Sequence, residues 1–430
     1  MSAPNRSVAP PISQFADVHL SFPTCQCLSN GIPLWVVGGG DTAINRLNIY
    51  VRSGLMRERR VMQSMLTAMM VIEGSTTRDS EQIAQQLDYY GSWKSAQSHD
   101  EYSEVTLSSI NSRYDRTLPI VMECLEAPTF PVEPFEVLKR RYAANAATQR
   151  ERVKYLAVEE MRRLYYGENH PLSRRMLPED ILSLTIADLQ QFYQQYYHPS
   201  NCRVVLSGNV TDEVMRLTDE ILGRWNKPGE ETPDVDWTIH PSEQMNSVVD
   251  KPGAVQSAVL MALQAVPRNH PDYLVLRFLV MVLGGYFGSR LMSNIREDKG
   301  YTYGINAYLA GREHDAYIGI STECDVRYTH WVIDEVRREM DRLCREPIPA
   351  EELATVRQYM LSDLVKTLDT PFSVAGYVSS TLLYGVYPEY FNEQVATILR
   401  VTPEQLLEVA CRYLRTDALR TVIAGDSRHL

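Results

Sequence analysis

The sequence has no excess of positive charge and no long apolar run. Lys and Arg number 43 against 54 Asp and Glu, which gives the 430 residues a formal net charge of −11. A negative field repels phosphate backbones and anionic lipid headgroups, so neither nucleic acid nor a membrane surface is an expected partner. No 18 consecutive residues are apolar. The most apolar stretch, residues 274–285, carries Arg277 in its interior and indicates a buried helix, not a membrane span.

Cysteines are few and scattered. Their number, seven, is odd and their spacing suggests no disulfide framework, which favours a reducing compartment. Cys25 and Cys27 form a C-x-C without a second pair to complete a metal site, and are expected at a strand edge. Residues 1–20 lack the apolar core of a secretion signal, and their prolines oppose the amphipathic helix of a transit peptide. These features predict a cytoplasmic protein, and we expect a bacterial one.

The usual catalytic motifs are also missing. No two of the nine histidines are four residues apart, so neither H-E-x-x-H nor H-x-x-E-H occurs. Both motifs work because residues i and i+4 share a helix face, where two imidazoles hold zinc beside a glutamate that activates water. The nearest approach to such a motif is His330 with Asp334, and we interpret these two residues as an ordinary pair on the surface. Neither a G-x-S-x-G elbow nor a P-loop is present.

An internal repeat is the most informative feature that is present. Residues 184–209 and 401–426 align without gaps at an offset of 217, half the chain. Each copy has a threonine N-cap, an amphipathic helical pattern and a β-branched strand that ends in glycine. Upstream of each copy, YYG at 165–167 corresponds to LYG at 383–385. A period this long indicates two homologous domains.

The pattern of elements predicts an α+β fold with antiparallel sheets covered by helices. Alternating strands are expected at 46–54, 101–110 and 257–266 and in a hairpin around Gly311, with long helices between them, one of which spans 133–166. Four prolines and an acidic excess mark 226–253 as a linker. The predicted division is an N-terminal domain at 1–225, the linker, and a C-terminal domain at 254–430.

Two local clusters are candidates for chemistry. Arg296 lies near the end of a predicted helix with a Lys-Gly stop, and Tyr303 lies at the start of the next strand. Together they could bind a peptide carbonyl or an oxyanion, or they could be an ordinary solvated helix end and a strand residue. His99, Asp100 and Glu101 stand together in SHDE, which is more typical of a hairpin tip than of a site.

Taken in order, five segments resemble the pitrilysin or insulinase family of zinc peptidases, in particular its half-length members such as mitochondrial processing peptidase subunits and bacterial relatives. They cover most of the chain: LSNGIPLWVV (28–37), VRSG (51–54), EGST (73–76), YYHPSNCRVVLSGNV (196–210) and LGGYFGSRLMSNIREDKGYTYG (283–304). The resemblance implies two homologous α+β domains per subunit, and two subunits that close around an unfolded peptide.

The family's zinc motif is degenerate in this chain. The resemblance implies H-x-x-E-H on a helix of the first domain and a glutamate ligand about 77 residues later. Counting from Glu73, Met65 and Met69 occupy the histidine positions and Ala68 that of the catalytic glutamate, while Ala146 falls on the third ligand. Alanine has no donor atom, and thioethers are poor zinc ligands. The helical pattern of 62–76 predicts that Met62, Met65, Leu66 and Met69 lie on one buried face and fill the vacated volume.

The family's substrate-binding Arg and Tyr, by contrast, match Arg296 and Tyr303. The leading hypothesis is a non-catalytic subunit that binds no zinc, encloses peptide, and supplies these two side chains to an H-x-x-E-H partner that carries the zinc. Alone it is expected to be inactive, and a homodimer is one expected form of the isolated chain. The alternative is a structural or peptide-binding scaffold without a role in proteolysis. An autonomous peptidase with unrecognised ligands is a third possibility.

Overall fold

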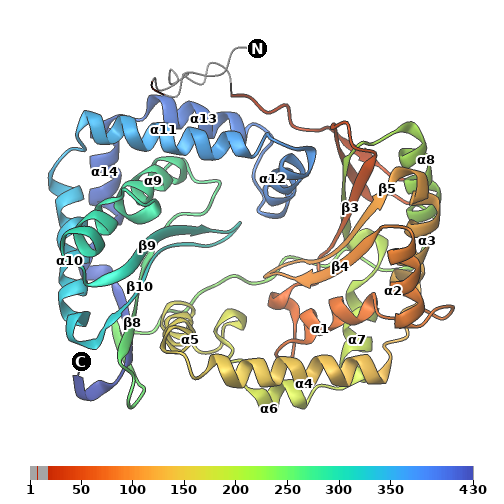
Figure 1. Cartoon of the computed structure of the whole chain (residues 1–430), viewed down its shortest axis with the longest axis horizontal. Helices are drawn as coiled ribbons and strands as arrows, with labels where there is room; N and C mark the ends of the chain where they lie inside the picture. Colours follow the sequence, from red (N-terminus) through yellow and green to blue (C-terminus); the bar gives the residue numbers. More distant parts are fainter. Residues whose placement is uncertain (1–6, 8–17, 430) are drawn as a thin grey trace.

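The computed structural model describes residue 7 and residues 18–429, and within them two sheets are each covered by helices (Figure 1). The first sheet has the strand order β1-β2-β6-β3-β5-β4. Its strands are β1 (Cys25–Cys27), β2 (Pro33–Gly38), β3 (Ile44–Val51), β4 (Trp93–Ser98), β5 (Ser103–Ile110) and β6 (Cys202–Gly208). Cys25 and Cys27 lie at the sheet edge, as predicted, and both are exposed.

The second sheet has the order β7-β11-β8-β10-β9. It is built of β7 (Asn246–Asp250), β8 (Gln256–Gln264), β9 (Thr302–Gly311), β10 (Ala316–Asp325) and β11 (Arg420–Gly425). Apart from β1, the two orders correspond strand for strand. In each sheet one pair is parallel, β2 with β6 and β7 with β11, and the other pairs are antiparallel.

Helices cover the sheets of both halves. Those of the first half are α1 (Gln63–Val71), α2 (Ser80–Tyr89), α3 (Tyr114–Glu126), α4 (Val132–Gln149), α5 (Val153–Tyr166), α6 (Pro178–Leu182), α7 (Ile186–Tyr196) and α8 (Asp212–Leu222). Those of the second are α9 (Tyr273–Val280), α10 (Thr329–Arg345), α11 (Ala350–Lys366), α12 (Pro371–Leu383), α13 (Tyr390–Arg400) and α14 (Pro403–Tyr413). The predicted α+β class is confirmed.

The sequence repeat corresponds to α7 followed by β6 and to α14 followed by β11. At the start of each helix a threonine, Thr185 or Thr402, accepts a hydrogen bond from the backbone N–H three residues later and completes a capping box. The apolar faces behind these caps, including Leu189 and Leu406, are fully buried. The repeated local signals therefore build the same helix and strand in each half.

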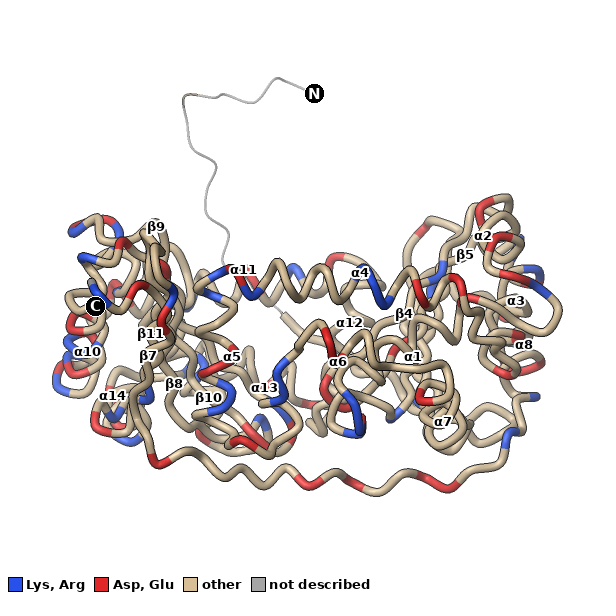
Figure 2. The backbone as a smooth tube through the Cα atoms, turned by 90° about the horizontal axis from the view of Figure 1, so that it is seen from below, with Lys and Arg blue, Asp and Glu red and all other residues tan. Residues whose placement is uncertain are grey.

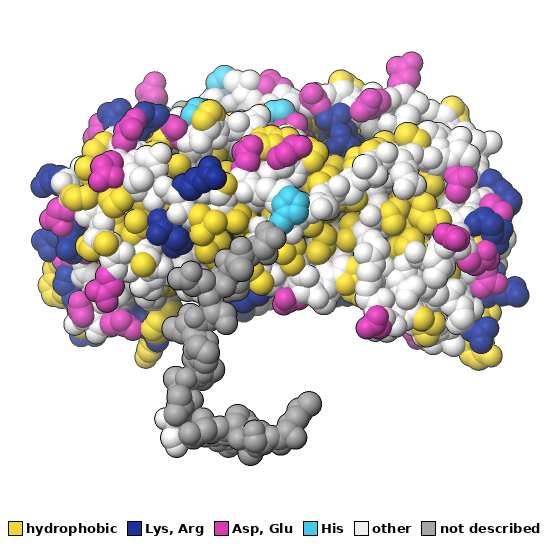
Figure 3. Space-filling model, turned by 90° about the horizontal axis from the view of Figure 1, so that it is seen from above, with side chains coloured by type: hydrophobic (Ala, Val, Ile, Leu, Met, Phe, Trp, Pro, Cys, Tyr) yellow, Lys and Arg dark blue, Asp and Glu magenta, His cyan; other side chains and the backbone are white. Residues whose placement is uncertain are grey.

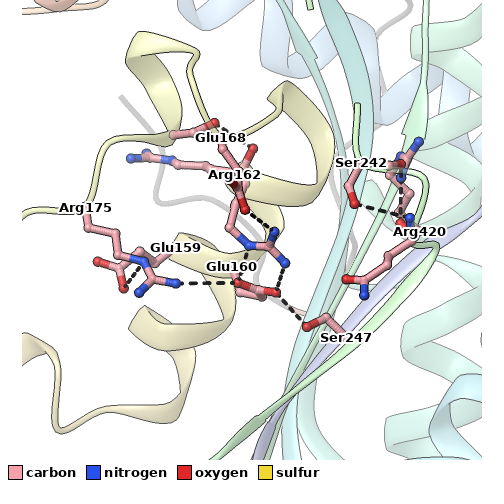
Figure 4. A network of polar contacts seen from close by, with 11 residues as sticks. Glu159, Glu160, Arg162, Glu168, Arg175, Ser242, Ser247 and Arg420 are labelled. Atoms are coloured by element: carbon pink, nitrogen blue, oxygen red, sulfur yellow. Dashed lines mark hydrogen bonds and ion pairs between the residues drawn. The ribbon is translucent and has the colours of Figure 1, made fainter. Parts of the chain in front are cut away.

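One helix of each half packs on the sheet of the other. Helix α5 lies on β8 and β11 of the second sheet, and α12 lies on β6 and β2 of the first. The exchange explains why the predicted helix at 133–166 is broken at Arg150–Arg152 into α4 and α5. A polar network at the edge of β7 holds α5, where the Ser247 hydroxyl donates to the Glu160 carboxylate at 2.6 Å (Figure 4).

A long segment joins the halves along one face of the molecule, at the lower edge of Figure 2, and carries several acidic residues. Residues 246–250 of the predicted linker form β7. Before β7, Asp234 pairs with Arg52, and Trp237 is buried. Residues 1–6 and 8–17, from which the absence of an export signal was predicted, lie outside the described residues. Within the described ones, none of the helices has the length and apolarity needed to cross a membrane.

The tips of two hairpins meet where the halves join. The predicted tip at SHDE connects β4 to β5, and residues 312–315 connect β9 to β10. Arg312 Nε donates to the Asp100 carboxylate at 2.6 Å, and Arg312 Nη1 donates to the Tyr166 hydroxyl at 2.6 Å. Seen from above, hydrophobic side chains gather along the middle of the molecule and charged ones toward its two ends (Figure 3).

Candidate functional site

Helix α1 starts at an unusual backbone turn that a buried carboxylate stabilises. Met62, the N-cap, adopts a left-handed conformation with φ of 67° and has no capping side chain of its own. The carboxylate of Glu58 accepts hydrogen bonds from the backbone N–H of Met62 and from both the N–H and the hydroxyl of Ser64. Burial raises the pKa of Glu58 to about 7, although these hydrogen bonds favour its charged form.

The four degenerate zinc positions lie on two helices that pack together, α1 and α4. Ala68 is fully buried and Ala146 is 3% exposed. Met65 and Met69 are only partly buried, so the expectation that both lie on the buried face is wrong. Most of the helix is buried instead: its buried residues are Gln63, Ser64, Leu66, Thr67, Ala68, Met70 and Val71.

The partial exposure of Met65 and Met69 follows from the way α1 packs against α4 and the first sheet. Leu66 and Met70 belong to the core of the first half, whereas Met65 packs against the margin of that core. Met69 accepts a hydrogen bond from the hydroxyl of Tyr142, one turn before Ala146 on α4, at 3.3 Å. The side chains at these positions offer thioethers and methyl groups in place of imidazole and carboxylate, a poor donor set for zinc.

Beside α1 lies a cavity of about 310 Å³ whose walls come from α1, α5 and residues 171–176. Met62 and Met65 line it together with Tyr155 and Arg162. Because methionine side chains are flexible and polarizable, such a wall can adapt to apolar groups of different shape.

Arg296 and Tyr303 lie in the other half. Arg296 is part of a π-helical segment, Met292–Asp298, that ends before Gly300, whose φ is 66°. Tyr303 is the second residue of the edge strand β9 and its side chain is 92% exposed. The guanidinium of Arg296 stacks on the ring of Phe287 at 4.7 Å, and Phe287 is itself 61% exposed.

Neither side chain has a polar partner within residues 18–429, where no ion pair or side-chain hydrogen bond involves Arg296 or Tyr303. The predicted helix end and strand start are confirmed, and they bring both residues to one end of the second sheet. That end lies in the half opposite α1 and α4 (Figure 1). The chain thus does not join the Arg and Tyr to its own degenerate zinc positions.

Comparison with known proteins gives the same family as the sequence segments. Residues 183–360 match the family described as Peptidase M16 inactive domain. The chain is 20% identical to the uncharacterized zinc protease YmxG of Bacillus subtilis, covering 81% of this chain and 84% of that protein. The predicted family is confirmed. The chain is also similar to the non-peptidase homolog YmxG of Helicobacter pylori, with 23% identity over 56% of each chain.

The M16 fold is matched over nearly the whole length. The structure of a peptidase M16 inactive domain from Pseudomonas fluorescens superposes with a TM-score of 0.85 and 20% identity, and the match covers 94% of this chain and 98% of that one. The chain is thus similar to the M16 family over its second half and in its fold, and it has methionine and alanine at the four zinc positions. The roles of Arg296 and Tyr303 stay predictions.

Hydrogen peroxide is expected to oxidise Met65 and Met69 before Met70, because the first two are partly exposed and Met70 is fully buried. Peptide mapping by mass spectrometry after short exposure would measure the three rates. Met122, 2% exposed, is an internal control that should react as slowly as Met70. Equal rates at all four positions would contradict the partial exposure of Met65 and Met69.

Proposed function

We propose that this protein is the non-catalytic subunit of a two-subunit metallopeptidase. It encloses the peptide together with an H-x-x-E-H partner, which carries the zinc, and directs Arg296 and Tyr303 toward the partner's site. The observation that supports this most directly is that Arg296, partly exposed, and Tyr303, exposed, have no polar partner among the described residues, while the zinc positions hold only Met and Ala. A cytoplasmic location in a bacterium is part of the proposal.

The physical basis is charge stabilisation. When water bound to zinc attacks a peptide carbonyl, negative charge develops on the carbonyl oxygen. A guanidinium and a phenolic hydroxyl held nearby stabilise that charge without needing to titrate. Phe287, stacked against the guanidinium, limits its freedom and so lowers the entropy lost when substrate binds.

The proposal is tested by reconstitution. The purified chain is expected to cleave no peptide, and mixing it with an H-x-x-E-H homologue is expected to give cleavage that a chelator abolishes. A fluorogenic peptide library with each subunit alone and with the mixture provides the measurement. Chelator-sensitive cleavage by the chain alone would instead favour an autonomous peptidase with ligands elsewhere.

The second candidate function is a scaffold that binds peptide or other subunits and takes no part in proteolysis. Similarity to a non-peptidase homolog of Helicobacter pylori favours it. Under this function the chain would assemble with its partner, and the partner would cleave peptides at the same rate with or without it.

A further inference from the structure

The joint between the halves contains a charged cluster outside the family's site. Glu101, at the tip of the β4–β5 hairpin, faces Glu313 and His314, at the tip of the β9–β10 hairpin. One ligand atom from each residue lies within 4.8 Å of the other two. The separation between His314 Nε2 and Glu313 Oε2 is 3.7 Å. Two carboxylates and an imidazole, from segments more than 200 residues apart, thus converge on one point.

Glu101 is the unusual member of this cluster. Its side chain is 7% exposed, and within the described residues its carboxylate takes part in no hydrogen bond or ion pair. A buried charge without a partner is costly, and a second carboxylate beside it raises that cost. The backbone of Glu101 is fixed, because its carbonyl accepts a hydrogen bond from the N–H of Gly54 at 2.8 Å. A Cβ at Gly54 would meet that backbone at 2.3 Å, so the absence of a side chain at Gly54 allows the hairpin tip to pack this closely.

The nearby arginines compensate this charge only in part. Arg52 and Arg57 face Glu101 and favour its charged form, whereas Glu313 and Asp100 oppose it. Arg52 is already paired with Asp234, and Arg57 donates to the carbonyl of Pro233. Arg312 is held by Asp100 and Asp315. Burial, followed by the neighbouring Glu313, raises the pKa of Glu101 to about 7.

We propose that a divalent cation of the Zn²⁺ type binds to Glu101, Glu313 and His314 and fastens the two halves to each other. One imidazole and two carboxylates suit Zn²⁺ better than Mg²⁺ or Ca²⁺, which prefer oxygen ligands alone. Ligand bonds of about 2.1 Å require the three donor atoms to lie within roughly 4 Å of one another. Glu313 and His314 already satisfy this. Their half-buried and exposed side chains lie at a hairpin tip, where the His314 ring is next to Trp237, and a small shift toward Glu101 would complete the site.

The ion would compensate the buried charge of Glu101 and would join both hairpin tips next to the Arg312 contacts. From sequence, no metal is expected in this chain, but that expectation concerned the degenerate positions on α1 and α4. The cation site proposed here shares no residue with them. It is also independent of any peptidase partner.

The test is Zn²⁺ binding by the full chain. After treatment with a chelator and buffer exchange at pH 7.5, titration calorimetry with ZnCl₂ is expected to show one site, and Zn²⁺ to raise the melting temperature. Glu101→Gln and His314→Ala should each weaken binding at least about tenfold, since each removes one of three ligands. His330→Ala, which removes an exposed histidine outside the cluster, should bind as wild type does.

Four further measurements keep the result unambiguous. Exposed thiols at Cys25 and Cys27 could bind Zn²⁺ themselves, so a Cys25→Ser/Cys27→Ser variant is expected to retain the site. Mg²⁺ and Ca²⁺ should not raise the melting temperature, and affinity for Zn²⁺ should fall as the pH is lowered from 7.5 to 5.5 because protons compete for the ligands. Without metal, Glu101→Gln is expected to melt at or above the wild-type temperature, because it removes a buried charge.

Three outcomes would overturn the proposal. The first is no Zn²⁺ binding by the wild type. The second is unchanged binding by both Glu101→Gln and His314→Ala, of which the latter alters an exposed tip residue and should fold normally. The third is loss of binding in the cysteine variant. In each case a proton on Glu101, and not a cation, would account for the buried carboxylate.

Discussion

Replacing Arg296 by Ala in the reconstituted complex is expected to lower kcat for peptide hydrolysis about 100-fold, the usual consequence of removing one donor to a developing oxyanion. The effect should appear mainly in kcat, because the guanidinium stabilises charge that is greater in the transition state than in the bound peptide. Stability of the free chain should hardly change, since Arg296 makes no ion pair within the described residues. Steady-state kinetics on the saturated complex provides the measurement.

Two further variants separate the role of Arg296 from a general effect of charge. Arg400, exposed at the end of α13, is a matched arginine, and Arg400→Ala should leave kcat unchanged. Tyr303→Phe keeps the ring and removes only the hydroxyl, so a drop in kcat would assign a hydrogen bond to it. If Arg296→Ala keeps full turnover in a complex that still assembles, the scaffold function replaces the proposed one.

The local signals in the sequence predict the elements well where one residue decides the outcome. Thr185 and Thr402 cap their helices as expected, and Gly300 ends the segment that carries Arg296. The exchange of α5 and α12 between the sheets could not be predicted in this way. An amphipathic helix requires an apolar face to cover, but its sequence does not identify which of two similar sheets supplies that face.

In the candidate site, too, some features can be predicted from the sequence and others cannot. Loss of the zinc ligands at Met65, Met69 and Ala146 follows directly from residue types, which need no coordinates. The exposure of Met65 and Met69 depends on how α4 lies against α1. Helical periodicity alone predicts that both side chains are buried, whereas both are partly exposed. The sequence predicts a hairpin tip at Glu101, and the structure confirms it, yet the neighbours Glu313 and His314 come from the other half and no local pattern relates them to Glu101.

Replacing Arg312 by Leu is expected to lower the free energy of unfolding by about 3–5 kcal/mol, the usual cost of removing one member of a buried ion pair. Asp315, 7% exposed, would keep uncharged donors, among them the hydroxyls of Tyr165 and Tyr166, but no cation, and Asp100 would lose its partner in the other half. Urea unfolding at pH 7.5 provides the measurement.

The size of this effect depends on the charge left behind on Asp315, so neutralising that charge should restore part of the stability. The double variant Arg312→Leu/Asp315→Asn is therefore expected to be more stable than Arg312→Leu alone, a coupling that independent sites would not show. Arg327→Leu is the matched control, because Arg327 pairs with Asp325 on the surface and its loss should leave unfolding unchanged. If Arg312→Leu unfolds like Arg327→Leu, the contacts of Arg312 do not hold the halves together, and the joint depends on the exchanged helices α5 and α12 alone.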